Sequence, residues 1–463
     1  MSKRFFAALA RWPACVAAGP FLFFTGQMGL RAAGQPCAGF GEAGGRGPGA
    51  GSEFDWLNRM EGPVGAQAIA IYERYRRLLA AQGGELASLL RYHIYQRDKR
   101  FFPVFDRVRR HYETAPPSST AVGVGRFEPA DQARLCIDGI ALRPAAARTL
   151  GARTVLGGSG KHAAAAHFSH VIGTGPYLFL AGQIPVDTSQ PGAPLIRNYE
   201  DIPQEGRFLR AGRSHEDARN GPIAAQTWFT YDLIRKHLEG AGSALDQVLN
   251  LIVYLQDMRD FPTFHRVHER FFGASPPALT VVEVGEVGHK GTLIEIEPTA
   301  ILPGRGARRR VFEAPREARA AHMSAAVESA GLAFLSGIPG VAADGGAATA
   351  VNDLPAAWRR YARTSRARRP NEITVQTAAV VAQLDERLRQ MGRNLSRVVH
   401  LTVYVDDIGE FMTVAPMLEQ AFGKWRPALA VIEVPQPSPL AGVRVSGTAI
   451  AWIGDNEPAV LAG

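Results

Sequence analysis

Cysteine is scarce in this sequence of 463 residues, and long apolar runs are absent. The three cysteines, Cys15, Cys37 and Cys136, are odd in number and all lie in the first third of the chain. This pattern argues against a disulfide framework and favours a reducing compartment. No run approaches the roughly 18 consecutive apolar residues that a membrane span needs. We therefore expect a cytoplasmic protein without a membrane-spanning segment.

Motifs for several kinds of chemistry are also missing. The sequence has no metal-ligand spacing, no phosphate-cradling glycine loop and no Ser-His-Asp arrangement above chance, so we expect neither a metal nor a cofactor. The formal charge of +9 includes two arginine-rich runs, at residues 305–310 and 359–369. Neither run stands beside stacking aromatic residues or a nucleic-acid-binding module. Both indicate solvated connectors, and we expect no nucleic-acid partner.

The sequence does contain one pattern that is used three times. An apolar stretch that runs into a glycine turn occurs at residues 19–30, 175–187 and 330–341. The turn glycines are Gly26, Gly182 and Gly337, which are separated by 156 and 155 residues. A fixed long period means that one structural unit is repeated, and the chain length also suggests about three domains. We define repeat 1 as residues 1–150, repeat 2 as 151–305 and repeat 3 as 306–463.

Each repeat predicts the same order of elements. An insertion follows the glycine turn, at residues 31–62, 188–221 and 342–370. Next comes a helix whose apolar positions are three and four residues apart, then a strand, a second amphipathic helix and two closing strands. The predicted fold class is α+β, with the order β-β-α-β-α-β-β in each repeat. Helices on one side leave the other face of each sheet bare, so we expect three such faces to bury each other as an intramolecular pseudo-trimer.

Several segments of repeat 2 resemble one known family. They are Ala181-Gly-Gln-Ile-Pro-Val-Asp187, Val253-Tyr-Leu-Gln-Asp257, the strand at 277–284 and Ile294-Glu-Ile-Glu297. In this order they are similar to the RidA/YjgF family of enamine and imine deaminases. The resemblance implies a trimer with ligand clefts at the subunit interfaces, working on small reactive intermediates. The chain resembles that trimer fused into one polypeptide, so we expect a monomer that binds a small molecule, with a dimer as the alternative.

The same resemblance implies cleft residues that this chain has largely changed. Active deaminases of the family clamp the substrate carboxylate with an arginine, a bidentate contact that no other side chain makes equally well. That position corresponds to Ser119, Leu279 and Leu429 in the three repeats. The glutamate that positions the hydrolytic water corresponds to Cys136, Glu295 and Arg444. Ordinary imine deaminase activity is therefore expected to be very low.

Repeat 2 keeps the most of the family pattern and supplies the catalytic candidates. These are Glu295, as a general acid or base, and His265, at the start of the second helix. The alternatives are an edge-strand glutamate paired with an arginine and an exposed histidine. The other expected substrate-binding residues are Phe168, Ala181, Gly182, Gln183, Leu279, Thr280, Ser119, Cys136, Leu429 and Arg444.

Two of these residues have competing interpretations. Cys136 indicates a buried strand residue more readily than a nucleophile, because no basic partner is predictable beside it. Arg444, together with Arg426, either restores an anion clamp in repeat 3 from another backbone position or serves on the surface.

Two functions from different classes remain open. One is an enzyme that acts on a small metabolite in a cleft between repeats, with chemistry shifted away from imine hydrolysis. The other is a non-catalytic ligand-binding or scaffold protein that keeps only the fold. Loss of every clamp favours the second, whereas Glu295 and the three long insertions favour the first. We favour the enzyme, and the sequence does not identify its substrate.

Overall fold

The structure is a computed structural model that describes residues 2–32, 34–42, 55–156, 167–304, 306–314, 322–363 and 370–461. Part of the first insertion and some of the arginine-rich positions lie outside these residues, namely 43–54, Arg305, Arg366, Arg368 and Arg369.

The three repeats contain the same seven elements in the same order. Repeat 1 consists of β1 (Cys15–Ala18), β2 (Phe21–Met28), α2 (Asp55–Ala80), β3 (Leu89–Gln96), α3 (Phe102–Tyr112), β4 (Ser118–Gly123) and β5 (Leu135–Leu142). Repeat 2 consists of β7 (Val171–Thr174), β8 (Tyr177–Leu180), α5 (Ser214–Gly240), β9 (Val248–Leu255), α6 (Phe261–Phe272), β10 (Ala278–Glu283) and β11 (Ile294–Ile301). Repeat 3 consists of β13 (Ala326–Ser329), β14 (Leu332–Pro339), α8 (Glu372–Gln390), β15 (Val398–Val405), α9 (Phe411–Phe422), β16 (Ala428–Glu433) and β17 (Val445–Trp452). The predicted α+β fold is confirmed.

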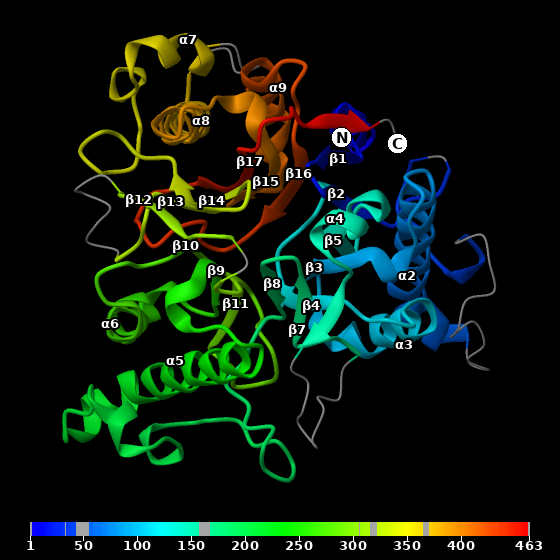
Figure 1. Ribbon diagram of the computed structural model, residues 1–463. Helices are drawn as coiled ribbons and strands as arrows, with labels where there is room; N and C mark the ends of the chain where they lie inside the picture. Colours follow the sequence, from blue (N-terminus) through cyan, green and yellow to red (C-terminus); the bar gives the residue numbers. More distant parts are fainter. Residues whose placement is uncertain are drawn as a thin grey trace.

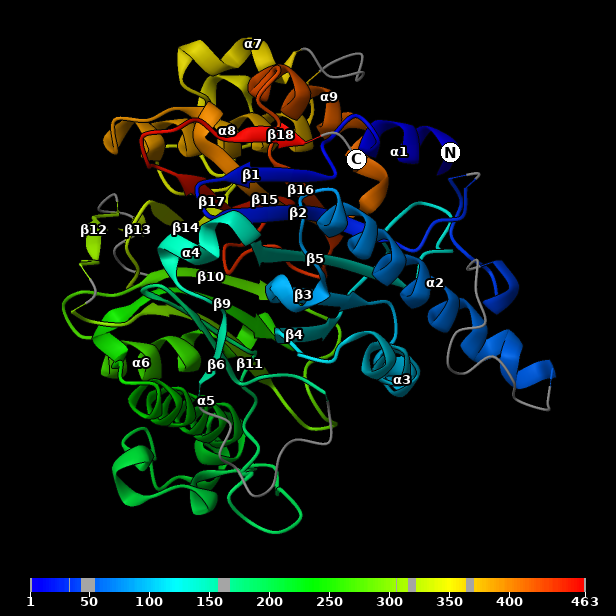
Figure 2. The ribbon, with the colours of Figure 1, turned by 45° about the vertical axis from the view of Figure 1, so that its right-hand side comes forward.

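Three short strands link the repeats into a closed ring. Each repeat's sheet is extended by a strand that follows the preceding repeat: β6 (Thr154–Leu156) pairs with β7, and β12 (Arg310–Phe312) pairs with β13. The last strand, β18 (Ala459–Leu461), pairs antiparallel with β1 and returns the end of the chain to the first sheet (Figure 2). The three six-stranded sheets therefore have the same strand order, with β18-β1-β2-β5-β3-β4 as the first.

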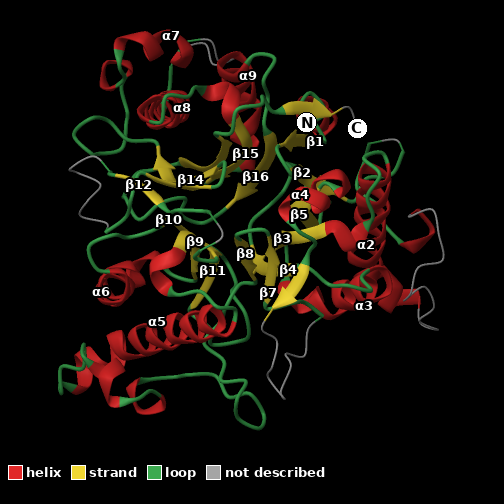
Figure 3. Cartoon of the chain, in the orientation of Figure 1, coloured by secondary structure: helices red, strands yellow, loops and turns green. Residues whose placement is uncertain are grey.

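The sheets face inward and the long helices lie outside them (Figures 1 and 3). Buried aromatic side chains from different repeats meet at the centre; the rings of Phe21 and Tyr177, for example, lie 5.3 Å apart. Helices α2, α5 and α8 each bury an apolar stripe on the outer face of their own sheet. Burial of both sheet faces explains why the strands read as nearly continuous apolar runs.

Two of the helices begin earlier than the sequence predicts. Helices α2 and α5 begin at Asp55 and Ser214, inside the segments predicted as insertions. For α5 the extra turns carry Glu216 and Asp217, whose negative charges favour a helix N-terminus.

Three more helices were not predicted. They are α1 (Ser2–Leu9), α4 (Ala147–Leu150) and α7 (Arg359–Ala362). Helix α1 packs on α9, where the rings of Phe5 and Phe411 lie 5.3 Å apart. Of the helices in the described residues, none is both long enough and apolar enough to cross a membrane. The same residues contain no group of three or more metal-ligating side chains that could hold an ion.

Candidate functional site

The three junctions between repeats are built in one way. The edge strand of one repeat lies against the glycine turn of the next, and we call the junctions the 1–2, 2–3 and 3–1 interfaces. At the 1–2 interface Gly182 donates its backbone N–H to the carbonyl of Ser119, at 3.2 Å. At the other two, the backbone N–H groups of Leu279 and Leu429 donate to the hydroxyls of Ser336 and Thr25, at 2.8 and 3.0 Å.

Strand register decides which residue occupies the family glutamate position. Glu295 lies opposite Tyr254, and Cys136 lies opposite the equivalent Tyr95. The residue opposite the third tyrosine, Tyr404, is Ser446. The sequence alignment that placed Arg444 at this position is therefore wrong by two residues.

Arg444 has a surface role. Its guanidinium pairs with Asp406 at 2.8 Å and lies 3.8 Å from Glu410, and 30% of its side chain is exposed. Its backbone N–H donates to Gln376 in the way that Leu293 donates to Gln226, which confirms the corrected register.

The contacts of the turn glycines show which residues of two neighbouring repeats meet at each interface. A Cβ on Gly182 would collide with Oε1 of Glu295 and with Thr120. A Cβ on Gly26 would lie 2.7 Å from Sγ of Cys136 and 3.4 Å from Ala430. Glu295 of repeat 2 therefore faces the edge strand of repeat 1. An arginine introduced at Leu279 would enter a different interface and would not meet Glu295.

Glu295 is buried in the 1–2 interface with one oxygen unsatisfied. It is 4% exposed, and its Oε2 has no hydrogen-bond partner among the described residues. Burial raises the pKa of this carboxyl, and the nearby Lys99 opposes the shift. Because β11 lies between β8 and β9, Glu295 does not fit the alternative of an edge-strand glutamate, and no arginine pairs with it among the described residues.

Repeat 1 differs from the other two repeats at two neighbouring positions, one of which is Lys99. The equivalent residues are Met258 and Ile408, whose backbone N–H groups donate to Glu283 and Glu433, each at 2.8 Å. Repeat 1 has Gly123 in place of these glutamates. The Lys99 side chain passes over Gly123 and donates to the carbonyl of Ala121. Burial lowers the pKa of Lys99, and the carboxylate of Glu295 opposes that shift.

An arginine stands near the clamp position of the 1–2 interface, but it comes from a helix. Arg109 on α3 is 1% exposed, and its Nη1 donates to the hydroxyl of Ser119 at 3.2 Å. Asp106 accepts from Nη2 and Nε of the same guanidinium at 2.6 and 3.0 Å. The cation is thus already paired where the family substrate would bind.

His265 does not meet Glu295, so the predicted catalytic pair is not assembled. His265 lies on α6, half-buried, with Nδ1 3.8 Å from Glu269 and its ring 5.7 Å from the ring of Phe261. Phe261 lines a cavity at the 2–3 interface together with Leu279. The prediction failed because the two residues belong to one repeat but face two different neighbours.

The 2–3 interface holds a cavity of about 750 Å³. Its walls are mainly apolar and come from α6, β10, the segment before β13, the turn after β14, α8 and the loop before β17; they include Phe261, Leu279, Val281, Met323, Val341 and Leu440. Thr280 and Ser446, at the family strand positions, also line it. The cavity therefore occupies the place of a family ligand cleft.

Arg387 is the buried cation of this cavity. It lies on α8, is 6% exposed, and donates from Nη1 to the carbonyl of Ser336 at 2.8 Å. Burial lowers its pKa to about 10, and the neighbouring Glu386 opposes that shift. Among the described residues no carboxylate lies within ion-pair distance of it, while Asp353, also in the lining, is satisfied by two backbone N–H groups.

At the 3–1 interface the residues at the family strand positions are buried. Leu429 is 1% exposed and belongs to the same buried cluster as Phe5 and Ala8 of α1. Cys136 is equally buried, and burial raises the pKa of its thiol well above the ordinary value, which fits the prediction of an unreactive strand residue.

A buried ionic network lies between repeats 1 and 2, and the sequence analysis missed it. Oε1 of Glu297 lies 3.0 Å from Nη1 of Arg91 and 2.8 Å from Nε2 of His93, whose Nδ1 lies 2.5 Å from Asp138. Burial alone would lower the pKa of His93, but the two carboxylates raise it to about 10. The sequence did carry a signal for Glu297: it lies two residues after Glu295 on one strand, and residues two apart on a strand lie on the same face of the sheet.

The remaining predicted residues lie around the turns. Ala181 and Gln183 are buried, and the Gln183 amide folds back to donate to the Ala181 carbonyl at 2.8 Å, which is a structural role. Phe168 is half-buried, with its ring 4.9 Å from that of His170. Thr280 donates across the 2–3 interface to Thr448 at 3.0 Å.

The fold and the interfaces define the class of protein. It consists of three repeats, each of which is a sheet covered by helices, and the residues at the positions of the family clefts lie where the repeats meet. A family model described as Endoribonuclease L-PSP matches residues 159–302 and 314–451, which is more than half of the chain. The chain belongs to this family, the RidA/YjgF group, as the sequence analysis predicted. Repeat 1 lies outside the matched ranges up to residue 158, but it has the same order of elements.

Individual relatives match about one repeat. RutC family protein PH0854 of Pyrococcus horikoshii is 35% identical over 133 residues, 29% of this chain and 85% of the relative. The 3-aminoacrylate deaminase RutC of Acinetobacter baylyi is 29% identical over 119 residues, 25% of this chain and 94% of the relative. A crystal structure of Rv2704 from Mycobacterium tuberculosis, described as a member of the YjgF/YER057c/UK114 family, is 25% identical with a TM-score of 0.24, covering 32% of this chain and 100% of that one.

Proposed function

We propose that this protein binds a small organic acid with an apolar body in the cavity at the 2–3 interface. The observation that carries the proposal is Arg387, a buried guanidinium that has no carboxylate partner among the described residues and lines a cavity of about 750 Å³. Cavities of this size and apolar lining suit small metabolites, with a few polar groups that fix their orientation. Arg387 would take over from α8 the anchoring task that the family assigns to a strand arginine.

Binding without imine hydrolysis fits the residues of this cavity. The position of the water-positioning glutamate is occupied by Ser446, whose hydroxyl donates to the Pro437 carbonyl at 2.6 Å. The acidic residues of the described lining are Glu386, which is exposed, and Asp353, which is already bonded to the backbone. The cavity thus has an anchor for a carboxylate and lacks a buried acid or base.

The first prediction tests the anchor. Arg387→Gln is expected to weaken the binding of hexanoate by about tenfold to a hundredfold, because a charge-assisted hydrogen bond is lost. Isothermal titration calorimetry of the full chain gives the affinity. Arg389→Gln is the matched control, since Arg389 lies on the same helix with 74% of its side chain exposed.

Two results would contradict the proposal. One is an affinity for hexanoate that Arg387→Gln leaves unchanged. The other is equally tight binding of hexanamide, which has the same apolar chain without the charge.

A second candidate function is enzymatic and belongs to the 1–2 interface. Glu295 there keeps a buried carboxyl with a raised pKa, and its Oε2 has no hydrogen-bond partner in the described part of the chain; these are the properties of a general acid or base. A relative with 29% identity is a 3-aminoacrylate deaminase. Slow hydrolysis of 3-aminoacrylate or a related enamine is the reaction that this interface would support.

The second prediction tests this candidate. Glu295→Gln is expected to lower 3-aminoacrylate hydrolysis by at least about a hundredfold, since it keeps the shape and removes the titratable group. Ser446→Ala, at the same strand position in repeat 3, should leave the rate unchanged. Lys99→Met, which introduces the residue of repeat 2, should raise the pKa of Glu295 further and move the pH profile of the rate upward. Absence of turnover in the unaltered protein, or full activity in Glu295→Gln, would eliminate the enzymatic candidate.

Nucleic acid is not among the proposed ligands. In the first arginine-rich run, Arg309 donates to the carbonyls of Val248 and Pro276, at 2.8 and 2.7 Å, and Arg310 lies 3.4 Å from Glu328. In the second, Arg359 donates to the carbonyl of Leu354 at 3.1 Å. These described arginines hold loops and strand ends, which supports the expectation of connectors.

A further inference from the structure

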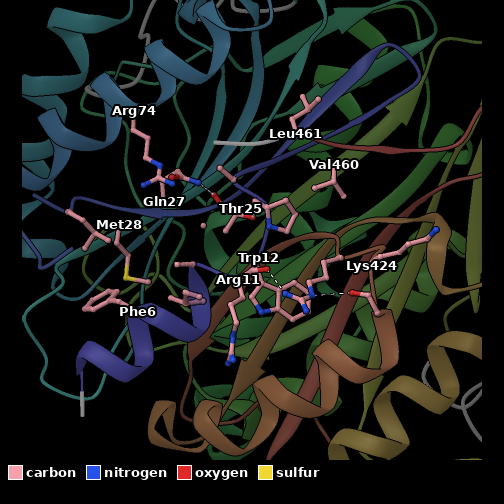
Figure 4. Close-up of a pocket in the computed structure, with 18 residues that line it drawn as sticks. Phe6, Arg11, Trp12, Thr25, Gln27, Met28, Arg74, Lys424, Val460 and Leu461 are labelled. Carbon is pink, nitrogen blue, oxygen red and sulfur yellow. Dashed lines mark hydrogen bonds between the residues drawn. The ribbon is translucent and has the colours of Figure 1, made fainter. Parts of the chain in front are cut away.

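The three family clefts offer different groups to a ligand. A cavity of about 550 Å³ at the 3–1 interface is the family cleft there (Figure 4). Its Arg74 and Trp12 are the equivalents of two residues that line the 2–3 cavity, Gln383 and Met323. Its described lining also contains Lys424, which is exposed, whereas the described lining of the 2–3 cavity contains no lysine. The 1–2 interface differs from both, because a half-buried lysine lies beside a buried acid there.

Lys99 places its amino group at the 1–2 interface, beside residues whose equivalents form cleft walls at the 2–3 interface. Its Nζ donates to the carbonyl of Ala121 and lies 5.8 Å from the centre of the Phe102 ring. The equivalents of Ala121 and Phe102 in repeat 2 are Val281 and Phe261, and both line the 2–3 cavity. The amino group therefore occupies the family cleft position of the 1–2 interface.

Two features of repeat 1 bring the lysine to this position. The equivalent side chain in repeat 2, Met258, is 5% exposed and is not among the described residues that line the 2–3 cavity. Gly123 replaces the glutamate that ends this strand in the other repeats, and a Cβ on Gly123 would lie 3.3 Å from Cγ of Lys99. The two exchanges together therefore direct an amine into the cleft position of the 1–2 interface.

Lys99 and Glu295 form a pair of neighbouring titratable groups. Burial lowers the pKa of Lys99, and the carboxylates of Glu295 and Glu286 oppose that shift. Burial raises the pKa of Glu295, while Lys99 and the backbone N–H of Ala121 oppose that shift. Both side chains therefore reach Ala121. An amine with a lowered pKa and a carboxyl with a raised pKa adopt their neutral forms at neutral pH more readily than the same groups do in water.

We propose that Lys99 forms a covalent imine with a small aldehyde at the 1–2 interface, with Glu295 as the proton donor. The lone pair of Nζ adds to the carbonyl carbon, a C–N bond forms, and a proton passes from nitrogen to oxygen, which gives a carbinolamine. Glu295 then protonates the hydroxyl, which leaves as water. The products are an iminium ion on Lys99 and the carboxylate of Glu295 beside it. A desolvated lysine suits this chemistry, because the neutral amine is the form that attacks a carbonyl group.

This inference goes beyond both proposed functions, since neither joins a ligand covalently to the chain. Hydrolysis of 3-aminoacrylate releases ammonia and an aldehyde, so the second candidate function would deliver this class of ligand to the same interface. The imine does not depend on that turnover, because an aldehyde can be supplied directly.

The third prediction tests the imine with propanal and sodium cyanoborohydride, which reduces an imine to a stable secondary amine. Peptide mass spectrometry of the full chain at about pH 7.5, where an exposed lysine is almost entirely protonated, measures the rate of modification at each lysine. Lys99 is expected to react at least about tenfold faster than Lys424, because each unit by which a lysine pKa falls below about 10.4 gives about tenfold more neutral amine. Lys424 is a matched control: it lines a family cleft and lies 5.0 Å from the Trp425 ring, but it is exposed.

Glu295→Gln tests the proton donor. The variant is expected to slow modification of Lys99 by at least about tenfold and to leave Lys424 unchanged. If Glu295 acted only through its charge, the variant would lower the pKa of Lys99 further and speed the reaction instead. Lys99→Met, which introduces the residue of repeat 2, should remove the fast-reacting site without slowing the other lysines. Melting temperatures check that the variants are folded.

Two results would overturn the proposal. One is a Lys99 that reacts no faster than Lys424 in the unaltered protein, a comparison that needs no variant. The other is a rate at Lys99 that Glu295→Gln leaves unchanged or raises. Failure of hexanoate binding or of 3-aminoacrylate turnover would alter neither rate, so the outcome is separate from that of the proposed functions.

Discussion

Arg91→Met is expected to lower the free energy of unfolding by about 3 to 5 kcal/mol. Arg91 is 1% exposed and lies 3.0 Å from Glu297, which is fully buried. Its Nη1 also donates to Thr299 of repeat 2 at 2.7 Å. Removing the cation leaves a carboxylate in the 1–2 interface whose remaining partners among the described residues are His93 and the Thr120 hydroxyl. Urea denaturation followed by circular dichroism measures the loss.

Two further variants show whether the cost comes from the unpaired charge. Arg97→Met removes a half-exposed partner of Asp131, 2.9 Å away, and should cost less than about 1 kcal/mol. Arg91→Asn with Glu297→Thr introduces the uncharged residues found at the equivalent positions, Asn250 and Thr448. This double variant should be more stable than Arg91→Met alone. A double variant that is less stable than the single one would contradict the argument.

The ring of three repeats could be predicted because its signals are local and repeated. Gly26, Gly182 and Gly337 mark the same turn, and the helical and strand periodicities after them recur in the same order. Periodicity reports which face of an element is buried, and three agreeing copies reinforce each prediction. The boundaries were less accurate, as the early start of α5 at Ser214 shows.

The site was less predictable, because its halves come from different repeats. Leu279 and Glu295 lie on consecutive strands of repeat 2, but Leu279 faces repeat 3 and Glu295 faces repeat 1. No pattern within one repeat reveals this difference. The register error at Arg444 has a simpler cause. Glu433 and Ser446 are 13 residues apart, whereas Glu283 and Glu295 are 12 apart, so the loop before the last strand is one residue longer in repeat 3, which accounts for one of the two residues of the error.

The cations of the cavities were missed for a related reason. The family resemblance directed attention to one strand position, whereas Arg387, Arg109 and Arg74 project from helices. A side chain as long as arginine reaches a cleft from several backbone positions. Its destination depends on packing between repeats, which helical periodicity does not record.

Lowering the pH from 7.5 to 5 is expected to reduce the free energy of unfolding by about 2 kcal/mol through His268 alone. His268 is fully buried; its Nδ1 accepts from the Tyr231 hydroxyl at 2.8 Å, and its Nε2 donates to the His322 carbonyl at 3.0 Å. Burial lowers its pKa to about 3, and the nearby His322 and His265 rings add to the shift while the carbonyl opposes it.

The sign follows from the depressed pKa of the folded state. In the unfolded chain His268 takes up a proton near its ordinary pKa of about 6.5, while the folded form stays neutral until about pH 3. The stability that His268 contributes is therefore complete above pH 6.5 and is lost at about 1.4 kcal/mol per unit as the pH falls toward 3. His93, whose folded pKa is raised to about 10, acts in the other window: its contribution is complete below pH 6.5 and is lost as the pH rises through 10.

His268→Leu, which introduces the residue that repeat 3 has at this position, Leu418, isolates the effect. The variant loses a hydrogen bond to Tyr231 at every pH, so the decisive quantity is the difference in unfolding free energy between pH 7.5 and pH 5. That difference should shrink by about 2 kcal/mol, while replacing the exposed His111 should leave it unchanged. An acid-induced loss that is as large in His268→Leu as in the unaltered protein would show that other groups, such as His237 with its pKa near 4, carry the pH dependence.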